Sequence, residues 1–196
     1  MDLVKTRTSV ITDRYEFQRF YAGRITGVVL NAACGDDAAR LAELPIGAIN
    51  MDIQDSEPWS GHGFDKPQNY VHGSVFKIPF NENHFEGVVL GEFLEHCKFK
   101  EALDAVLECR RVLNHGGELI ITVPLDWRPI EEQRMGPDDN SPMSHGEITT
   151  YHQTWWSNKM LQDLLRESRM WETVRSPLYY MLTAPIGGWG LVWEKP

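Results

Sequence analysis

A short apolar run that ends in one glycine and leads into a helix-forming segment constrains the fold of this chain more than any other feature. Residues 27–37 read Gly-Val-Val-Leu-Asn-Ala-Ala-Cys-Gly-Asp-Asp, and residues 38–44 have helical composition. A buried strand, a tight turn and a helix in this order form a βα corner. Backbone amides at the start of such a helix can approach a ligand closely. The segment therefore predicts a ligand-binding corner of an α/β protein.

Four further apolar runs have the length of strands. They span residues 47–52, 70–73, 85–90 and 118–123. The run at 85–90 is almost continuously apolar, as expected of a parallel strand that is covered on both faces. Helical periodicity over 99–113 separates the last two runs, and the sequence Asn-His-Gly-Gly at 114–117 predicts the turn that ends this helix.

The alternation of strands and helices from Gly27 to Val123 predicts a Rossmann-like, doubly wound, mostly parallel sheet with helices on both faces. Helical spacing recurs at 13–21 and at 151–168. Two last apolar runs, at 171–174 and 189–193, predict an antiparallel hairpin of edge strands. We therefore expect an α/β fold with about seven strands, of which the last is antiparallel.

The length of 196 residues predicts a single domain, 1–196, that buries a sufficient core without disulfides. Residues 1–24 are expected to form an N-terminal docking or lid segment. Residues 125–150 are rich in Pro, Gly, Asp and Ser and show no periodicity. Because a loop of this length in a compact domain is usually functional or disordered, we expect it on the side of the site where a second substrate binds.

Composition and charge disfavour several classes of protein. The net charge of −9 disfavours nucleic-acid partners, since phosphate contacts need clustered Lys and Arg. No stretch approaches the roughly 20 apolar residues of a membrane span, and no secretion signal is apparent. Three cysteines without CxxC spacing indicate free thiols in a reducing compartment. We expect a cytoplasmic monomer or homodimer with no membrane or nucleic-acid partner.

Asp52 is the first candidate for a binding residue. In an open parallel sheet, ligands bind outside the carboxyl ends of the strands, where the strand order reverses. Asp52 ends the second predicted strand and follows Gly35 by 52 − 35 = 17 residues. This is close to the spacing of about 20 residues expected for a carboxylate that binds ribose hydroxyls. The alternative is a solvated turn residue or a helix cap, and we favour the ribose role.

The charge of the corner discriminates between nucleotides. A pyrophosphate at this helix N-terminus would meet Asp36 and Asp37 at about 4–6 Å, where like charges repel strongly. A nucleoside without phosphate, and preferably with a positive charge, fits better. S-adenosylmethionine has both properties, because it joins adenosine to a sulfonium and an amino acid. The same two aspartates disfavour a nicotinamide-dependent oxidoreductase.

The chain resembles the class I S-adenosylmethionine-dependent methyltransferases of the small-molecule group. The resemblance rests on five segments in the family's order: the first motif, the second strand, the adenine-binding turn with Ile-Pro-Phe and Leu-Glu-His, the Arg-Val-Leu-x-x-Gly-Gly turn, and a late helix. These segments are residues 28–43, 48–53, 73–96, 110–124 and 152–168. The resemblance implies an enzyme with S-adenosyl-L-methionine as cofactor.

The first motif departs from the family pattern Asp/Glu-x-Gly-x-Gly-x-Gly. Asn31 stands at the acid, Ala33 at the first glycine and Asp37 at the third, so that only Gly35 is retained. Asn31 can still bind an ammonium group, but without charge. Ser74 or a neighbour stands where the family has an adenine-binding Asp. These departures leave open an alternative: a catalytically weak or inactive module that binds the cofactor or its homocysteine product in a regulatory or scaffold role.

The resemblance implies which residues bind the cofactor. Asn31 would lie near the amino group of the methionine part, Asp52 would take the ribose, and Ile53 would cover one face of the adenine. Residues 74–76 would meet the adenine edge, and the residues after the fourth strand would pass the methionine end. The implied set is Asn31, Ala33, Cys34, Gly35, Asp52, Ile53, Ser74, Val75, Phe76, Gly91 and Glu92.

A general base is the least defined part of the predicted site. Methyl transfer is an in-line displacement, so the protein mainly aligns the reactants and excludes water. A hydroxyl nucleophile also needs a base with a pKa near the working pH. Candidate bases are His96, Asp126, His145 and His152. The remaining histidines show no metal-ligand spacing, and we expect no metal site.

The acceptor is expected to be a small molecule: the hydroxyl, amine or carboxylate of a metabolite, sugar or natural product. Base-modifying amino-methyltransferases carry Asn/Asp-Pro-Pro-Tyr/Phe after the fourth strand, where this chain reads Leu90-Gly91-Glu92-Phe93. Cytosine-carbon methyltransferases need a Pro-Cys nucleophile, and no cysteine of this chain follows a proline.

Overall fold

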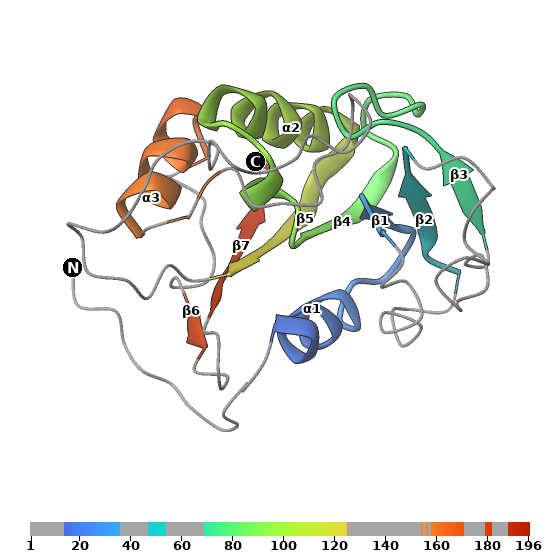
Figure 1. The fold of residues 1–196 in the computed structure, drawn as a ribbon. Coiled ribbons are helices and arrows are strands. Elements are labelled where there is room, and N and C mark those ends of the chain that lie inside the picture. Colours follow the sequence, from blue (N-terminus) through green and yellow to red (C-terminus); the bar gives the residue numbers. More distant parts are fainter. Residues whose placement is uncertain are drawn as a thin grey trace, which may run out of the picture.

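The computed structural model describes residues 14–35, 47–53, 69–124, 154, 156, 158–170, 179–181 and 188–196. Seven strands form one sheet in the order β3-β2-β1-β4-β5-β7-β6 (Figure 1). The strands are β1 (Val29–Ala32), β2 (Ile49–Asp52), β3 (Tyr70–His72), β4 (Phe85–Gly91), β5 (Leu113–Pro124), β6 (Tyr179–Met181) and β7 (Gly188–Glu194). The helices are α1 (Arg14–Ala22), α2 (Phe99–Val112), α3 (Asn158–Glu167) and the 3-10 helix η3 (Leu94–His96).

The topology is that of a doubly wound sheet. Strands β1 to β5 pair in parallel, and β7 runs antiparallel to both β5 and β6. This confirms the predicted Rossmann-like fold with an antiparallel last strand. The hairpin differs in one respect, since β7 lies inside the sheet and only β6 is at the edge. The strand order reverses between β1 and β4, so a ligand site is expected at their carboxyl ends.

Helices cover both faces of the sheet, as the sequence predicts. Helix α1 lies on one face, and α2 and α3 lie on the other (Figure 1). Because side chains alternate along a strand, Val88 and Leu90 of β4 face the helices α2 and α3, whereas Val89 faces α1. The main core lies on the α2 side, and a smaller cluster around Phe17 of α1 lies on the other.

The connection between β3 and β4 corrects the predicted alternation of strand and helix, because residues 73–84 cross without a helix. Two residues of α2 hold this connection instead. The Arg111 guanidinium donates to the carbonyls of Ile78 and Phe80, each at 3.0 Å. Glu108 Oε1 accepts from the Ile78 amide at 2.9 Å. These bonds satisfy backbone groups that a covering helix would otherwise satisfy within itself.

The turn predicted at 114–117 is wrong, since these residues belong to β5. The pairing with β4 shifts between Phe85↔Leu113 and Gly87↔Glu118, so that the Asn-His-Gly-Gly segment forms an irregularity within the strand. Gly116 has a φ of +79° and its amide donates to the Lys195 carbonyl at 2.7 Å. The end of the chain therefore supplies the pairing that keeps this segment extended.

The C-terminal part shows further differences of boundary. The helix expected over 151–168 begins at Asn158, and the Thr154 amide before it donates to the Glu95 carbonyl at 3.0 Å. The sixth strand is Tyr179–Met181, whereas the strand predicted at 171–174 lies outside the described residues. The predicted helix at 38–44, the segment before residue 14 and the loop 125–150 also lie outside the described residues.

Candidate functional site

The turn after β1 is folded against β2. Ala33 and Gly35 adopt left-handed φ values of +53° and +54°, and between them the Cys34 amide donates to the Met51 carbonyl at 2.9 Å. Glycine adopts this conformation freely, but alanine does so only at a steric cost. Burial, together with the charge of Asp52, raises the pKa of the Cys34 thiol. Cys34 is therefore a neutral packing residue and no nucleophile.

Asp52 joins this turn to the end of β2. Its side chain is buried, and Oδ2 accepts from the Gly35 amide at 2.8 Å. The backbone carbonyl of Asp52 accepts from the Gly73 amide at 2.9 Å and from the Tyr70 hydroxyl at 3.0 Å. The Gly35 amide thus holds the carboxylate of Asp52, and Gly73 and Tyr70 hold its backbone. A carboxylate has about four acceptor positions, and the Gly35 amide takes one of those of Asp52.

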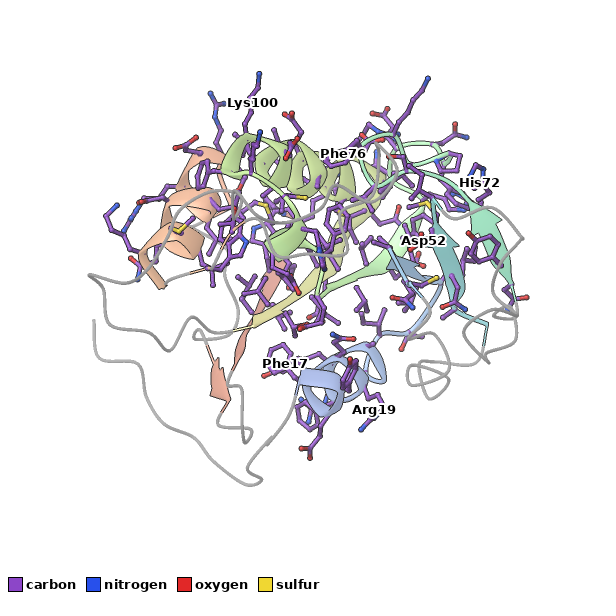
Figure 2. All side chains as sticks on the ribbon, in the orientation of Figure 1. Phe17, Arg19, Asp52, His72, Phe76 and Lys100 are labelled. Carbon is purple, nitrogen blue, oxygen red and sulfur yellow. The ribbon has the colours of Figure 1, made fainter. Side chains whose placement is uncertain are left out.

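Ile53 follows Asp52 and is 43% exposed, which is unusual for an isoleucine beside a buried acid. His72 Nε2 lies 2.9 Å from the Ile53 carbonyl. The labelled side chains of Asp52 and His72 come from the neighbouring strands β2 and β3 (Figure 2). Sequence reasoning missed His72 and Tyr70. Both belong to β3, and their side chains bind the backbone carbonyls of Ile53 and Asp52 at the end of β2.

Residues 74–76 form a tight turn after β3. Ser74 Oγ accepts from the Phe76 amide at 3.2 Å, and the Ser74 carbonyl accepts from the Lys77 amide at 3.0 Å. The Val75 side chain is buried in the main core, so only its backbone is left to meet a ligand. The Phe76 ring is half exposed and lies 5.9 Å from the Phe93 ring.

Phe76 also lines an open groove of about 590 Å³ beside α2. The other residues of the groove are Glu101, Asp104, Leu107, Glu108 and Arg111, all from α2. The structure therefore places Phe76 beside α2, and its predicted contact with the adenine edge stays a prediction.

Gly91 and Glu92 lie at the carboxyl end of β4. Glu92 has a left-handed φ of +53°, and its amide donates to the Thr122 carbonyl at 2.9 Å. The Thr122 hydroxyl accepts from Gln18 Nε2 of α1 at 2.6 Å. Gln18 is a third residue that sequence reasoning missed, because nothing in the sequence places α1 at this end of the sheet.

Asn31 is almost fully buried on the face of the sheet that packs against α1. Its Nδ2 donates to Asn50 Oδ1 on β2 at 2.9 Å. A pair of neutral amides therefore occupies the end of β1, at the position where the predicted family carries an acid. The other described residues of the predicted cofactor set lie after β1, β2, β3 and β4, along the carboxyl edge of the sheet.

Only one candidate base lies in the described residues. His96 is half-buried at the end of η3, and its amide donates to the Phe93 carbonyl at 3.0 Å. The other predicted site residues lie outside the described residues: Asp36, Asp37, Asp126, His145 and His152. Within the described part of the chain, no three His, Cys, Asp or Glu residues gather as a metal-binding group, and no helix is long and apolar enough to cross a membrane.

Solved structures share this fold. A 1,6-didemethyltoxoflavin-N1-methyltransferase from Burkholderia thailandensis, crystallised with 1,6-didemethyltoxoflavin and S-adenosylhomocysteine, matches with a TM-score of 0.64 and 17% identity, over 92% of this chain and 76% of the other. A SAM-dependent methyltransferase from Methanosarcina mazei matches at 0.62 and 17%, over 90% and 95%. The [4+2]-cyclase SpnF matches at 0.62 and 13%, over 91% and 79%.

The sequence comparison points the same way. No curated protein sequence matches this chain significantly. The family model described as "Methyltransferase domain" matches residues 30–121, which span β1 to β5 and hence the edge of the sheet described above. Methyltransferase domains of this fold use S-adenosylmethionine as cofactor. Residues 30–121 therefore match a methyltransferase domain, and the sheet has the Rossmann-like fold of the solved methyltransferases named above.

Proposed function

We propose that this chain is an enzyme that transfers the methyl group of S-adenosylmethionine to a small-molecule acceptor, and that residues 1–196 form one domain. The observation that carries the proposal is the bond from the Gly35 amide to Asp52 Oδ2. It ties the turn after β1 to a buried carboxylate at the end of β2. In this geometry a single acid can hold the ribose hydroxyls while the turn lies beneath the methionine part.

The neighbouring groups suit the rest of the cofactor. Ile53 offers an exposed apolar side chain beside the acid, where an adenine ring can pack. Ser74 and Val75 would meet the adenine edge, Val75 through its backbone amide. Cys34 and Ala33 would line the methionine part with small neutral groups. When bound, the cofactor would supply a methyl group on a positively charged sulfur, which needs no metal for transfer.

The acceptor side is defined only in outline. His96, after β4, is the described candidate for a base, and Asp126, His145 and His152 remain candidates in or next to the 125–150 loop. A small acceptor agrees with the net charge of −9, which disfavours a polyanion. The neighbour from Burkholderia thailandensis was crystallised with a small acceptor, 1,6-didemethyltoxoflavin. We further propose that the protein works in the cytoplasm as a monomer or homodimer, consistent with three buried free thiols.

Calorimetric titration with S-adenosylmethionine and S-adenosylhomocysteine tests the proposal. We expect both to bind to the wild type, and Asp52→Asn to weaken both by about tenfold or more, since hydrogen bonds to a charged group are the stronger kind. Asp104→Asn, on the exposed side of α2, is the matched control and should leave binding unchanged. No heat at millimolar ligand with folded protein would refute the proposal. Release of methyl label to a panel of small acceptors then tests transfer.

A second candidate is a cofactor-binding module without methyl transfer. The neutral Asn31–Asn50 pair motivates it, because the site lacks the carboxylate that the family's first motif supplies. SpnF, named as a [4+2]-cyclase, also has this fold, so the fold itself is compatible with other reactions. Binding of S-adenosylhomocysteine without transfer to any acceptor in a broad panel would favour this candidate.

A further inference from the structure

A buried glutamine on α1 is the polar group that the proposed function leaves unexplained. The inner face of α1 packs on the sheet through Phe17 and Ala22, which are fully buried. Gln18 stands beside Phe17 and is only 1% exposed. An amide in such a position is costly unless both of its polar atoms form hydrogen bonds. An apolar residue would pack equally well there, so the amide calls for a specific reason.

The Gln18 amide has only half of its hydrogen bonds. Nε2 donates to Thr122 Oγ1 of β5 at 2.6 Å. Oε1 is buried and has no hydrogen-bond partner among the described residues. The side-chain carbonyl oxygen of Gln18 is therefore a buried acceptor without a hydrogen-bond donor among the described residues.

Gly91 makes the room for this amide. A Cβ added at Gly91 would lie 2.3 Å from Gln18 Nε2 and 3.0 Å from Oε1, so any other residue would displace the side chain. The amide therefore lies directly on the backbone at the carboxyl end of β4. The next residue, Glu92, is bonded through its amide to the Thr122 carbonyl. Three elements, α1, β4 and β5, thus converge on the edge where the ligand site lies.

We propose that Gln18 binds the amino acid end of the cofactor, with its side-chain carbonyl accepting a hydrogen bond from the ammonium group. The inference rests on the proposed function, which puts the methionine end beside Gly91 and Glu92. An ammonium group carries three donors and so seeks acceptors. Asn31, on the same face of the sheet, is neutral and its amide already donates to Asn50. Gln18 therefore supplies an acceptor on a face where the family's carboxylate is missing.

The test compares two ligands that differ at the amino acid end. S-adenosylhomocysteine carries it, and 5′-methylthioadenosine has the same adenosine and thioether without it. We expect Gln18→Met, which keeps the shape and removes the amide, to weaken S-adenosylhomocysteine by about tenfold, the loss of one hydrogen bond to a charged group. Affinity for 5′-methylthioadenosine should not change. The thermal midpoint should change little, since the lost bond to Thr122 Oγ1 offsets the removal of a half-satisfied buried amide.

The controls separate this inference from the proposed function. Gln162→Met, on α3, should change neither affinity. If the wild type binds neither ligand, the proposed function fails. If the wild type binds both and Gln18→Met weakens neither, or weakens both equally, the role of Gln18 is refuted. If Gln18→Met does not fold, Gln18→Glu replaces it: tighter binding of S-adenosylhomocysteine alone supports the ammonium contact, and equal or weaker binding overturns it.

Discussion

The two faces of the sheet differ in size and in chemistry. Among the described residues, the cluster under α2 and α3 holds 26 buried apolar residues, and the cluster under α1 holds six. The strand residues that face α2 and α3 at the centre of the sheet are apolar, such as Val88 and Leu90. The α1 face carries buried polar groups at the ends of its strands, among them Asn31 and Thr122.

This difference indicates that one face mainly stabilises the fold and that the other mainly binds the ligand. Among the described residues, the larger apolar cluster supplies most of the buried apolar side chains, which are the main source of stability. The smaller face tolerates amides and hydroxyls, because its polar groups lie at the carboxyl edge, where a ligand can complete their hydrogen bonds. Substitutions on the α2 face should therefore change stability, and substitutions at the α1 edge should change binding.

The strongest test of this difference between the faces compares substitutions of two neighbouring valines on β4. Val88 and Val89 are adjacent and fully buried, but face opposite clusters. We expect Val88→Ala to lower the free energy of unfolding by about 3 kcal/mol and Val89→Ala by about 1.5 kcal/mol. The cavity cost is smaller beside α1, because one nine-residue helix can shift to fill it. Urea denaturation of both variants measures the difference, and equal losses would refute this difference between the faces.

The next effect concerns the β3–β4 connection on the α2 side. Arg111→Met removes bonds to the carbonyls of Ile78 and Phe80 and leaves Glu108 without its cation. We expect a loss of about 2 kcal/mol, reduced by the partial exposure of Arg111. Arg166→Met on α3 is the control, because its pair with Asp163 is solvent-exposed and its loss should leave stability nearly unchanged.

The same variant should change the pH dependence of stability. The hydrogen bond from Arg111 holds the pKa of Glu108 below its ordinary value. Stability from this pair is therefore fully present above the unfolded-state pKa of about 4.3, and is lost as the pH falls through the folded-state pKa. The difference in unfolding free energy between wild type and Arg111→Met should shrink below pH about 4.3. A difference that is constant from pH 7 to pH 3 would contradict the role of this pair.

The sequence predicts the sheet well because its central strands have one unambiguous pattern. The run 85–90 is apolar except for Glu86 and Gly87, and the structure places β4 there, at the centre of the sheet. The segment 114–117 misleads, since Asn-His-Gly-Gly has the composition of a turn. Only the pairing of Gly116 and Gly117 with Lys195, about 80 residues later, keeps it in a strand, and no local pattern encodes a contact of that range.

The sequence identifies site residues that have a characteristic spacing. It does not identify site residues that are brought together only by tertiary contacts. The 17-residue spacing of Gly35 and Asp52 singles out Asp52 as the ribose carboxylate, which stays a prediction, and the structure joins the two residues through a 2.8 Å bond. Phe76 is one of the three predicted adenine contacts after β3, and its packing near Phe93 and along the groove beside α2 follows from no local pattern. Gln18 reaches Thr122 across 104 residues, a contact that follows from how α1 packs and from no motif.

A smaller effect sharpens the comparison at the α1 edge. We expect Asn31→Asp to bind S-adenosylmethionine several-fold more tightly, because it restores a negative charge near the ammonium group. Asn50 can turn its amide to donate to the new carboxylate. The ligand-free variant should lose about 1 kcal/mol of stability, since Asn31 is only 1% exposed. Titration and denaturation measure the two effects, and unchanged or weaker affinity would mean that the ammonium group lies elsewhere.

The smallest expected effect is at the turn after β1, where Ala33 packs against the larger apolar cluster. Ala33 holds a left-handed φ of +53°, which costs a non-glycine residue about 1 kcal/mol. Ala33→Gly relieves this strain, but glycine also raises the entropy of the unfolded chain by a similar amount, about 0.4–1 kcal/mol. The net change in stability should stay within about 0.5 kcal/mol.

Gly47→Ala makes the reverse change at another left-handed position, with a φ of +94° and no atom within 4 Å of an added Cβ, so it tests backbone strain alone. It should lose about 1 kcal/mol, because a φ of +94° lies farther from the centre of the left-handed region than the +53° of Ala33. A loss of that size from Ala33→Gly would show that the packing of the Ala33 methyl group against the larger cluster outweighs the relief of strain.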